Sequence, residues 1–318
     1  MKNFIVRTIT GIIFVAAIVA SFLRPEAMVL LFSIVTGLTI WEFTGLVNER
    51  SSESHQARLD SRVMTDEGKA NERPSVSVNR FISTIAGVYF FFAMTYYCSD
   101  IYGGAAKSVV FIPYLITIVY LLVAELYLKQ ADPVNDWAYT MLSQMYIALP
   151  FSLLNVLAFT ATPDGLVAFN PLLPLSVFIF LWMNDTGAYC IGSLIGRHKL
   201  FPRISPGKSW EGSIGGAIVV LAVAYGIGWV DSIQILDSDR ASLLSRGLLS
   251  IPEWLGLGLV VVVFGTWGDL VESLFKRTLG IKDSGSILPG HGGMLDRFDS
   301  SLLAIPAAVV YLYTLSLF

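Results

Sequence analysis

The chain has 318 residues, of which 54% are hydrophobic and only 14% are charged, whereas an ordinary soluble domain is about 25% charged. This composition excludes a typical water-soluble fold, and a net charge of -3 excludes a generic basic nucleic-acid binder. Several apolar runs reach the roughly 18 to 20 residues needed to cross a hydrocarbon core of about 30 Å. We therefore predict an all-α, polytopic integral membrane helical bundle with about nine transmembrane helices in a lipid bilayer.

The apolar segments follow one another along the whole chain. They cover residues 4–23, 26–47, 81–98, 108–128, 138–160, 172–195, 213–230, 254–275 and 299–317. The first has the length of a signal peptide, but it lacks a clear small-residue cleavage site and a second span follows at once, so we expect it to be retained. Cys98 and Cys190 both lie in apolar segments, where we expect packing roles and no disulfide framework.

We divide the chain at residue 170 into two parts. Residues 1–170 hold the N-terminal membrane helices, and residues 171–318 hold the catalytic helices and loops. A polar insert at 48–79, rich in Ser, Glu, Arg and Asp, interrupts the first part. It has little to bury, so we predict a flexible cytosolic insert or a solvated helical hairpin without chemistry of its own.

The distribution of positive charge predicts the orientation, because Lys and Arg near helix ends are retained on the cytoplasmic side. With a cytosolic N-terminus and nine spans, all but four of the 21 basic residues fall on the inner side. The exceptions are Arg24, Lys107, Arg240 and Arg246. The nine-helix count and the orientation therefore support each other.

A first group of candidate residues lies around the sixth apolar segment. Asn184 and Asp185 interrupt that segment, and an ionisable residue within a span is a functional candidate by default. The next connection carries several positive charges, which serve as topology anchors about as readily as phosphate ligands. Its end, from Ser205 through Lys208 and Glu211, predicts a tight phosphate-binding turn that opens the following helix.

A second group begins at the end of the eighth apolar segment. Asp269, Glu272 and Lys276 are spaced i, i+3 and i+7, so they share one helical face. A carboxylate near the end of a span is costly without a partner, a metal or water. The simplest explanation is a helix end with a salt bridge to Lys276 or Arg277, and this alternative stays open.

The connection after this helix combines both charge signs with many glycines, which let backbone N–H groups approach an anion. Its charged and polar candidates are Lys276, Arg277, Lys282, Asp283, His291, Asp296, Arg297 and Asp299. Charge complementarity with the next helix end is the structural alternative for Asp296 and Asp299. The functional hypothesis is that Asp269 and Asp296, brought together from two helices, hold Mg²⁺, while basic side chains neutralise the remaining phosphate oxygens.

These motifs resemble a known family. The run SLFKRTLGIKDSGSILPGHGGMLDRFD, from Ser273 to Asp299, is similar to the signature of the phosphatidate cytidylyltransferases, also called CDP-diacylglycerol synthases. The similarity extends upstream to NDTGAY, GRHKL and SPGKSWEG, where Ser209 stands in place of an expected Thr and keeps the hydroxyl. The recognisable motifs cover about residues 180 to 300.

The resemblance implies that CTP and phosphatidate react to give CDP-diacylglycerol and pyrophosphate, with Mg²⁺ bound by Asp269 and Asp296. It also implies a homodimer. From the charged residues themselves we expect catalytic roles for Lys276 and Arg297, beside Asp269 and Asp296, and substrate binding by the other candidates. We expect the active site to face the cytosol at a bacterial inner membrane.

Two other function classes compete with this interpretation. A CTP-dependent lipid kinase for dolichol or phytol would also need metal and basic loops, but the full HGGMLDRFD run argues against it. A transporter or flippase would use buried Asp185 and Asp269 along an ion path, yet the polar motifs gather on one predicted face.

Overall fold

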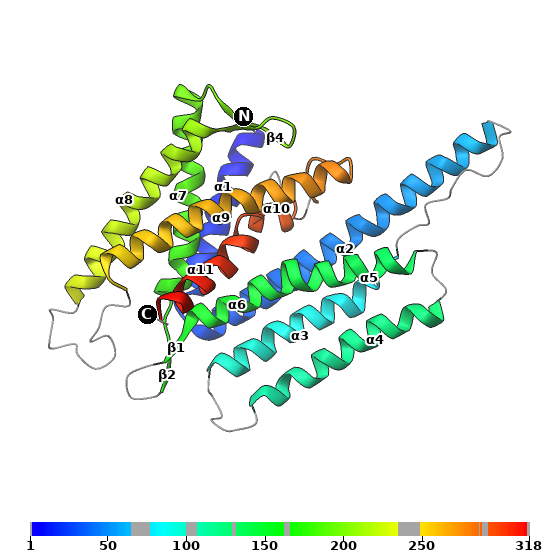
Figure 1. Cartoon of the computed structure of the whole chain (residues 1–318), viewed down its shortest axis with the longest axis horizontal. Coiled ribbons are helices and arrows are strands. Elements are labelled where there is room, and N and C mark those ends of the chain that lie inside the picture. The colour runs from blue at the N-terminus through cyan, green and yellow to red at the C-terminus, as the bar shows by residue number, and fades with distance from the viewer. Residues whose placement is uncertain are drawn as a thin grey trace. The chain divides into compact units, whose positions relative to one another are not determined.

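The computed structural model describes residues 2–64, 77–99, 107–128, 132–161, 166–234, 249–285, 287 and 292–316. In this part of the chain the regular structure is helical apart from two small two-stranded sheets, so the all-α prediction is confirmed (Figure 1). The chain divides into two compact units. Unit 1 comprises residues 1–155 and 279–297, and unit 2 comprises residues 156–278 and 298–318.

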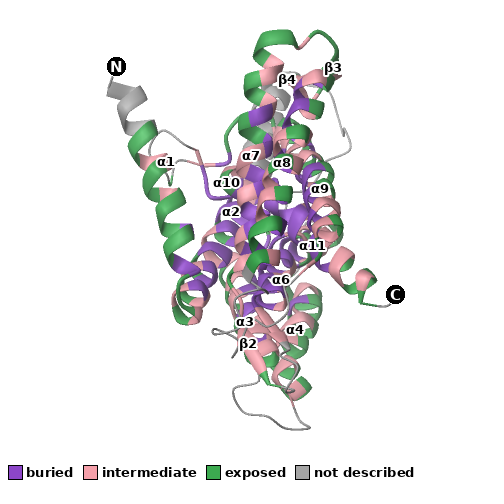
Figure 2. Cartoon of the chain, turned by 90° about the vertical axis from the view of Figure 1, so that its left-hand side faces the viewer, coloured by how far each residue is buried: buried purple, intermediate pink, exposed green. Residues whose placement is uncertain are grey.

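Among the described residues, seven helices are long and apolar enough to cross a membrane. They are Pro25–Glu49, Arg80–Ser99, Lys107–Leu128, Pro133–Ala158, Trp210–Ile233, Ile251–Thr278 and Leu295–Leu315. The other two predicted segments are also helical: the first retains a shorter apolar helix at Thr8–Ser21, and the sixth carries polar Asn184 and Asp185. Large apolar side chains are exposed along helices such as the first, which is largely green in Figure 2. The chain is an integral membrane protein.

Unit 1 is a set of packed helices from the N-terminal half. Its elements are α1 (Lys2–Ser21), α2 (Pro25–Met64), α3 (Arg80–Ser99), the 3₁₀ helix η1 (Lys107–Phe111), α4 (Ile112–Leu128), α5 (Pro133–Ser143), the π-helix η2 (Gln144–Ala148) and the start of α6 (Leu149–Ala158). Helix α2 packs against α1, α3 and α5, and α3 also contacts α4 and η2. The core between α2 and the start of α6 includes Phe32 and Phe151, whose ring centroids lie 6.3 Å apart.

Helix α2 continues well beyond its apolar part and includes the first half of the polar insert. No Gly or Pro interrupts residues 48–64, so the helix can continue through them. Residues 65–76 of the insert lie outside the described residues. Where the chain returns, Asn48 Nδ2 donates to Val78 O at 3.0 Å and Val78 N donates to Asn48 Oδ1 at 2.8 Å. These two bonds join residues at the two ends of the insert.

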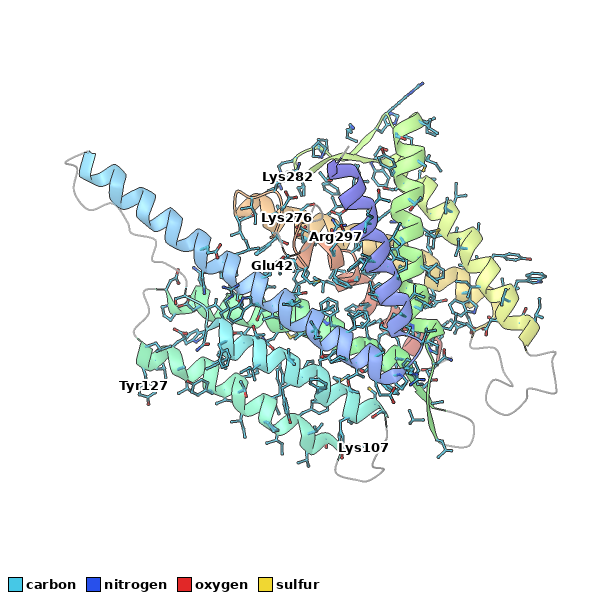
Figure 3. The ribbon with its side chains drawn as sticks, turned by 180° about the vertical axis from the view of Figure 1, so that it is seen from behind. Glu42, Lys107, Tyr127, Lys276, Lys282 and Arg297 are labelled. Carbon is cyan, nitrogen blue, oxygen red and sulfur yellow. The ribbon has the colours of Figure 1, made fainter. Side chains whose placement is uncertain are left out.

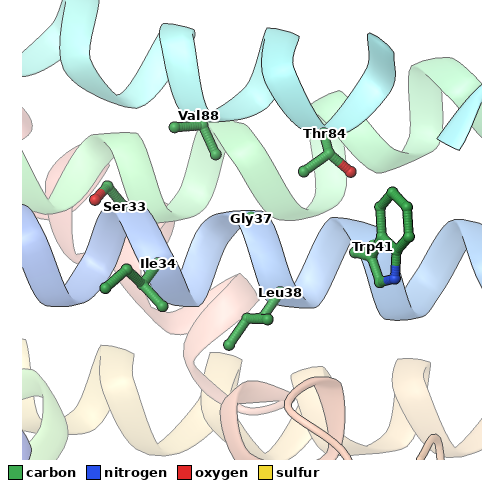
Figure 4. A pocket seen from close by; sticks show the side chains of 7 residues that line it. All are labelled: Ser33, Ile34, Gly37, Leu38, Trp41, Thr84 and Val88. Atoms are coloured by element: carbon green, nitrogen blue, oxygen red, sulfur yellow. The ribbon is translucent and has the colours of Figure 1, made fainter. Parts of the chain in front are cut away.

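A shallow groove of about 450 Å³ lies between α2 and α3 (Figure 4). Ser33, Gly37 and Trp41 line it from α2, and Thr84 and Val88 line it from α3. A Cβ at Gly37 would approach Val88 Cγ2 to 3.1 Å, so the small residue lets the two helices lie close together.

Unit 2 contains the remaining elements. They are β1 (Phe159–Ala161), β2 (Val167–Phe169), α7 (Leu172–Ile195), β3 (Lys199–Phe201), β4 (Ser205–Ser209), α8 (Trp210–Gln234), α9 (Ile251–Thr278) and α11 (Ser301–Leu315), while the short α10 (Leu295–Phe298) leads from unit 1 into it along the chain. Helix α7 packs against α8, α9 and α11, and α9 packs against α8 and α11. Figure 1 shows α7, α8 and α9 beside one another.

Glycines bring the backbones of α7 and α8 close together. A Cβ at Gly187 would lie 3.0 Å from Gly216 Cα, and a Cβ at Gly212 would lie 2.8 Å from Ala188 O. Small residues are the usual means by which membrane helices approach closely. This packing fixes the polar middle of α7 next to α8.

Candidate functional site

Asp269 occupies the centre of a polar cluster in unit 2. Its Oδ2 lies 2.6 Å from Lys208 Nζ, and its Oδ1 accepts a hydrogen bond from Ser273 Oγ at 3.1 Å. Lys208 comes from β4 and also donates to Thr266 O at 3.5 Å. Both members of the ion pair are about three-quarters buried, with side-chain exposures of 24% and 28%.

A further carboxylate interacts with Asp269 from another element. Asp299, in the turn between α10 and α11, interacts electrostatically with Asp269, Asp185 and Lys276. Gly268 allows this approach, because a Cβ there would lie 2.7 Å from Asp299 O. Asp299 therefore interacts with acidic side chains of α7 and α9, which carry Asp185 and Asp269.

Lys276 is paired with another acid of the same helix. Its Nζ lies 2.6 Å from Glu272 Oε2, and the Glu272 side chain is fully buried. The salt bridge expected as the structural alternative therefore exists, but it joins Glu272 to Lys276, whereas Asp269 pairs with Lys208. Arg277, in the last turn of α9, is exposed.

The predicted tight turn at the start of α8 is wrong in detail. Residues Ser205–Ser209 form strand β4, which pairs antiparallel with β3. Glu211, in the first turn of α8, accepts hydrogen bonds from Arg197 N at 3.1 Å and His198 N at 3.2 Å. Glu211 thus bonds the backbone that enters the hairpin, and the hairpin positions Lys208.

Asn184 is buried against α8. Its Oδ1 has no hydrogen-bond partner among the described residues, and a Cβ at Gly216 would lie 2.5 Å from it. The close approach of the two helices explains why this position of α8 carries no side chain. Asp185, the next residue, is the one that takes part in the acidic cluster.

Asp296 lies in unit 1 and closes a loop of the 279–297 segment. Its Oδ2 accepts hydrogen bonds from Ser284 N at 2.8 Å and Gly293 N at 2.9 Å. Gly292 has φ +81°, a conformation that favours glycine, and a Cβ there would lie 2.5 Å from the same oxygen. Gly292 therefore serves the folding of this loop around Asp296.

Glu42 is a residue of this site that sequence reasoning missed, because helix-end placement explained it equally well. It lies in α2, is 6% exposed, and accepts hydrogen bonds from Ser284 Oγ, from Met294 N at 2.8 Å and from Leu295 N at 3.1 Å. The available signal was a carboxylate within an apolar segment, which requires partners. Figure 3 labels Glu42 together with Lys282 and Arg297 of the 279–297 segment.

The remaining candidates differ in their accessibility. Lys282, Asp283 and Arg297 are exposed, Ser205 is half-buried in β4, and His291 lies outside the described residues. Asp269 and Asp296 belong to different units, so their meeting at one cation stays a prediction. Among the described residues no group of three or more His, Cys, Asp and Glu is arranged to hold a metal. Mg²⁺ nevertheless needs only one or two protein carboxylates beside phosphate oxygens, and Asp269 with its acidic neighbours supplies donors of that kind.

Comparison with known proteins agrees with this chemistry. The model of the cytidylyltransferase family matches residues 5–315. The phosphatidate cytidylyltransferase of Staphylococcus aureus (strain COL) is 40% identical over 175 residues, which are 54% of this chain and 57% of the relative. That of Haemophilus influenzae is 45% identical over 132 residues, which are 42% of each chain.

The matched regions thus cover 57% and 42% of the lengths of these two relatives. The family model, by contrast, extends over nearly all of the sequence, through both units. The chain therefore belongs to the cytidylyltransferase family.

Proposed function

We propose that the chain is a phosphatidate cytidylyltransferase, which transfers CMP from CTP to phosphatidate and releases pyrophosphate. The observation that carries this proposal is the Lys208–Asp269 ion pair in unit 2, together with Asp299, which interacts electrostatically with Asp269 and Asp185. Clustered charges of both signs suit a polyphosphate with a metal better than they suit a simple anion. The relatives' names supply the substrates.

The reaction is an in-line displacement. A phosphate oxygen of phosphatidate attacks the α-phosphorus of CTP, the new P–O bond forms, and the bond from that phosphorus to the bridging oxygen of pyrophosphate breaks. Both reactants are anions, so the barrier arises mainly from charge repulsion and transition-state charge. No protein nucleophile is needed.

Different residues bind the metal, stabilise charge and orient the metal ligand. Asp269 and Asp296 hold Mg²⁺, which when bound supplies positive charge to the phosphate oxygens. Lys276 and Arg297 stabilise the charge that develops on the transferred group and on pyrophosphate. Lys208 keeps the Asp269 carboxylate oriented, since the two are already 2.6 Å apart.

The membrane helices and the bacterial relatives support a location in a bacterial membrane. We place the site at the cytosolic face of a bacterial inner membrane, where CTP enters from the water while the diacyl tails remain in lipid. We also expect a homodimer.

One assay tests the function. Purified protein in detergent, given CTP, phosphatidate and Mg²⁺, should form a cytidine-bearing lipid and one pyrophosphate per turnover. Asp269→Asn and Asp296→Asn should each reduce the rate at least about 100-fold, because loss of a metal ligand charge is not replaced by an amide. Glu26→Gln, at an exposed acid of α2, serves as the control and should retain wild-type turnover.

The alternative functions give different products. Release of CDP with a newly phosphorylated lipid would identify a CTP-dependent kinase and contradict the proposal. Absence of turnover with phosphatidate, in protein that stays folded and binds no CTP, would contradict it in favour of a transporter.

A further inference from the structure

Glu42 presents a buried charge that the reaction itself does not use. It lies within the apolar span Pro25–Glu49 and is 6% exposed. A carboxylate in such a place is costly unless it is fully bonded. Among the described residues, the hydrogen-bond donors that reach it belong to Ser284, Met294 and Leu295, about 240 positions or more away in the sequence.

Both carboxylate oxygens of Glu42 accept hydrogen bonds. Oε1 accepts from Ser284 Oγ and from Leu295 N, and Oε2 accepts from Met294 N. Bonds from backbone N–H groups to a buried carboxylate are charge-assisted and stronger than neutral ones. Glu42 therefore fixes the backbone immediately before Asp296.

The glycines of the 279–297 segment fit around this carboxylate. A Cβ at Gly285 would lie 2.9 Å from Glu42 Oε2, and a Cβ at Gly293 would overlap Glu42 and Ser284. Two glycine positions are thus required by a side chain of α2, independently of any ligand.

Ser284 links the two acids. Its Oγ donates to Glu42 and accepts from Asp296 N at 3.3 Å, while its own N donates to Asp296 Oδ2 at 2.8 Å. Displacing Glu42 would therefore release Ser284, and with it the loop that orients Asp296.

We infer that Glu42 is a positioning residue, which holds the loop of Ser284 and Gly293–Asp296 so that Asp296 is oriented for the metal and the nucleotide phosphates. This inference rests on the proposed function. It assigns a part of the site to the N-terminal half of the chain, which the motifs alone leave without a role.

The test uses Glu42→Gln in the full-length protein in detergent. Glutamine keeps the shape but has one acceptor oxygen, and its amide would face a backbone N–H donor. We expect a kcat about 10- to 100-fold lower and a higher half-saturating Mg²⁺ concentration, because charge-assisted bonds to the loop are lost. Ser284→Ala should show the same change in smaller degree. Glu26→Gln on the same helix is the matched control and should show neither change.

A second measurement separates positioning from general stability. Hydrogen exchange of the Met294 and Leu295 amides should become faster in Glu42→Gln, while exchange in α7 and α8 stays as in the wild type. A purely structural role would lower the fraction of active protein without shifting the Mg²⁺ requirement. That pattern, or unchanged exchange at both amides, would overturn the inference.

The two hypotheses fail in different ways. If the wild-type protein makes no cytidine-bearing lipid, the proposed function is wrong, and the exchange measurement still decides whether Glu42 holds the loop. If the wild type is active and Glu42→Gln matches it in kcat and Mg²⁺ requirement, only the positioning role is wrong.

Discussion

Lys208 balances the acidic neighbourhood around Asp269. The two side chains form an ion pair about three-quarters removed from water, and the charges of Asp185 and Asp299 act on the same region. Like charges at short range repel strongly where water is scarce. The lysine therefore has an electrostatic role even before a substrate binds.

Replacing Lys208 with methionine should expose that role. The length of the side chain is kept, but the cation is lost, so the carboxylates repel one another and Asp269 is less well oriented. We expect a turnover at least about tenfold lower, by the loss of one charge-assisted contact. Initial rates of pyrophosphate release from CTP and phosphatidate measure it.

Lys208→Arg provides the comparison, because it keeps the positive charge on a side chain of similar length. It should retain most of the turnover. Wild-type rates in Lys208→Met, in protein with unchanged thermal stability, would show that the ion pair has no part in the reaction.

Single residues also show what can be predicted from the sequence. Asp185, Asp269 and Asp299 are identifiable because ionisable groups are rare in apolar segments and stand out by type alone. The role of Glu42 is not recognisable in this way, although the residue stands out equally. Its partners are mostly backbone N–H groups of a distant loop. Every residue except proline has such a group, so no pattern of side chains in the sequence predicts these bonds.

At the scale of elements, the contact between α7 and α8 determines where the polar residues lie. Gly187, Gly212 and Gly216 remove side chains from the contact, so the two backbones approach within van der Waals distance. Asp185, on α7, is held in place by this packing, and the strand that carries Lys208 leads directly into α8.

Gly216→Ala should loosen this contact. The added Cβ would lie 2.5 Å from Asn184 Oδ1 and 2.7 Å from Asn184 O, and the second of these is backbone that cannot rotate away. Overpacking of this kind costs about 1–3 kcal/mol. Thermal unfolding of the purified protein in detergent should show a lower midpoint.

Gly226→Ala is the matched control in the same helix. A Cβ at Gly226 meets nothing within 4 Å, and alanine favours a helix over glycine by up to about 1 kcal/mol. This variant should be as stable as the wild type or more stable. Equal losses in the two variants would contradict a specific role for the close contact.

The elements themselves are predictable to different degrees. The nine apolar segments correspond to helices, because hydrophobic length alone sets a span. The sequence predicts a turn where the structure has the β3–β4 hairpin. The hairpin is hard to predict because its strands pair Lys199 with Ser209 across a connection rich in Gly, Pro and basic residues, which is typical of turns. For the insert the sequence predicts a flexible chain or a helical hairpin, and the structure describes its first half as a continuation of α2.

For the whole molecule, the division into units departs from a split at residue 170. Residues 279–297 belong with the N-terminal helices, because Glu42 and its neighbours bind them. The split at residue 170 follows the motifs and remains a prediction about roles. Contacts that join distant parts of a chain are the ones that sequence periodicity cannot reveal.

The orientation of the chain in the membrane depends on whether α7 crosses the bilayer. This helix carries Asn184 and Asp185 and is not among the seven that meet the apolar criterion in the described part of the chain. If α7 crosses, five spans separate the polar insert from the connection between α8 and α9, so the two lie on opposite sides. If it does not cross, four spans separate them, and they lie on the same side.

Cysteine labelling distinguishes the two cases. In a Cys98→Ala, Cys190→Ala background, Ser54→Cys reports on the insert and Ser242→Cys reports on the connection after α8. A membrane-impermeant maleimide added to intact spheroplasts should label Ser242→Cys, and Ser54→Cys only after lysis, because the basic residues gather on the cytosolic side. Labelling of both before lysis, or of both only after it, would mean that α7 does not span the membrane. The reverse pattern would place the catalytic loops outside, where CTP is absent, and would contradict the assignment of the site to the cytosolic face.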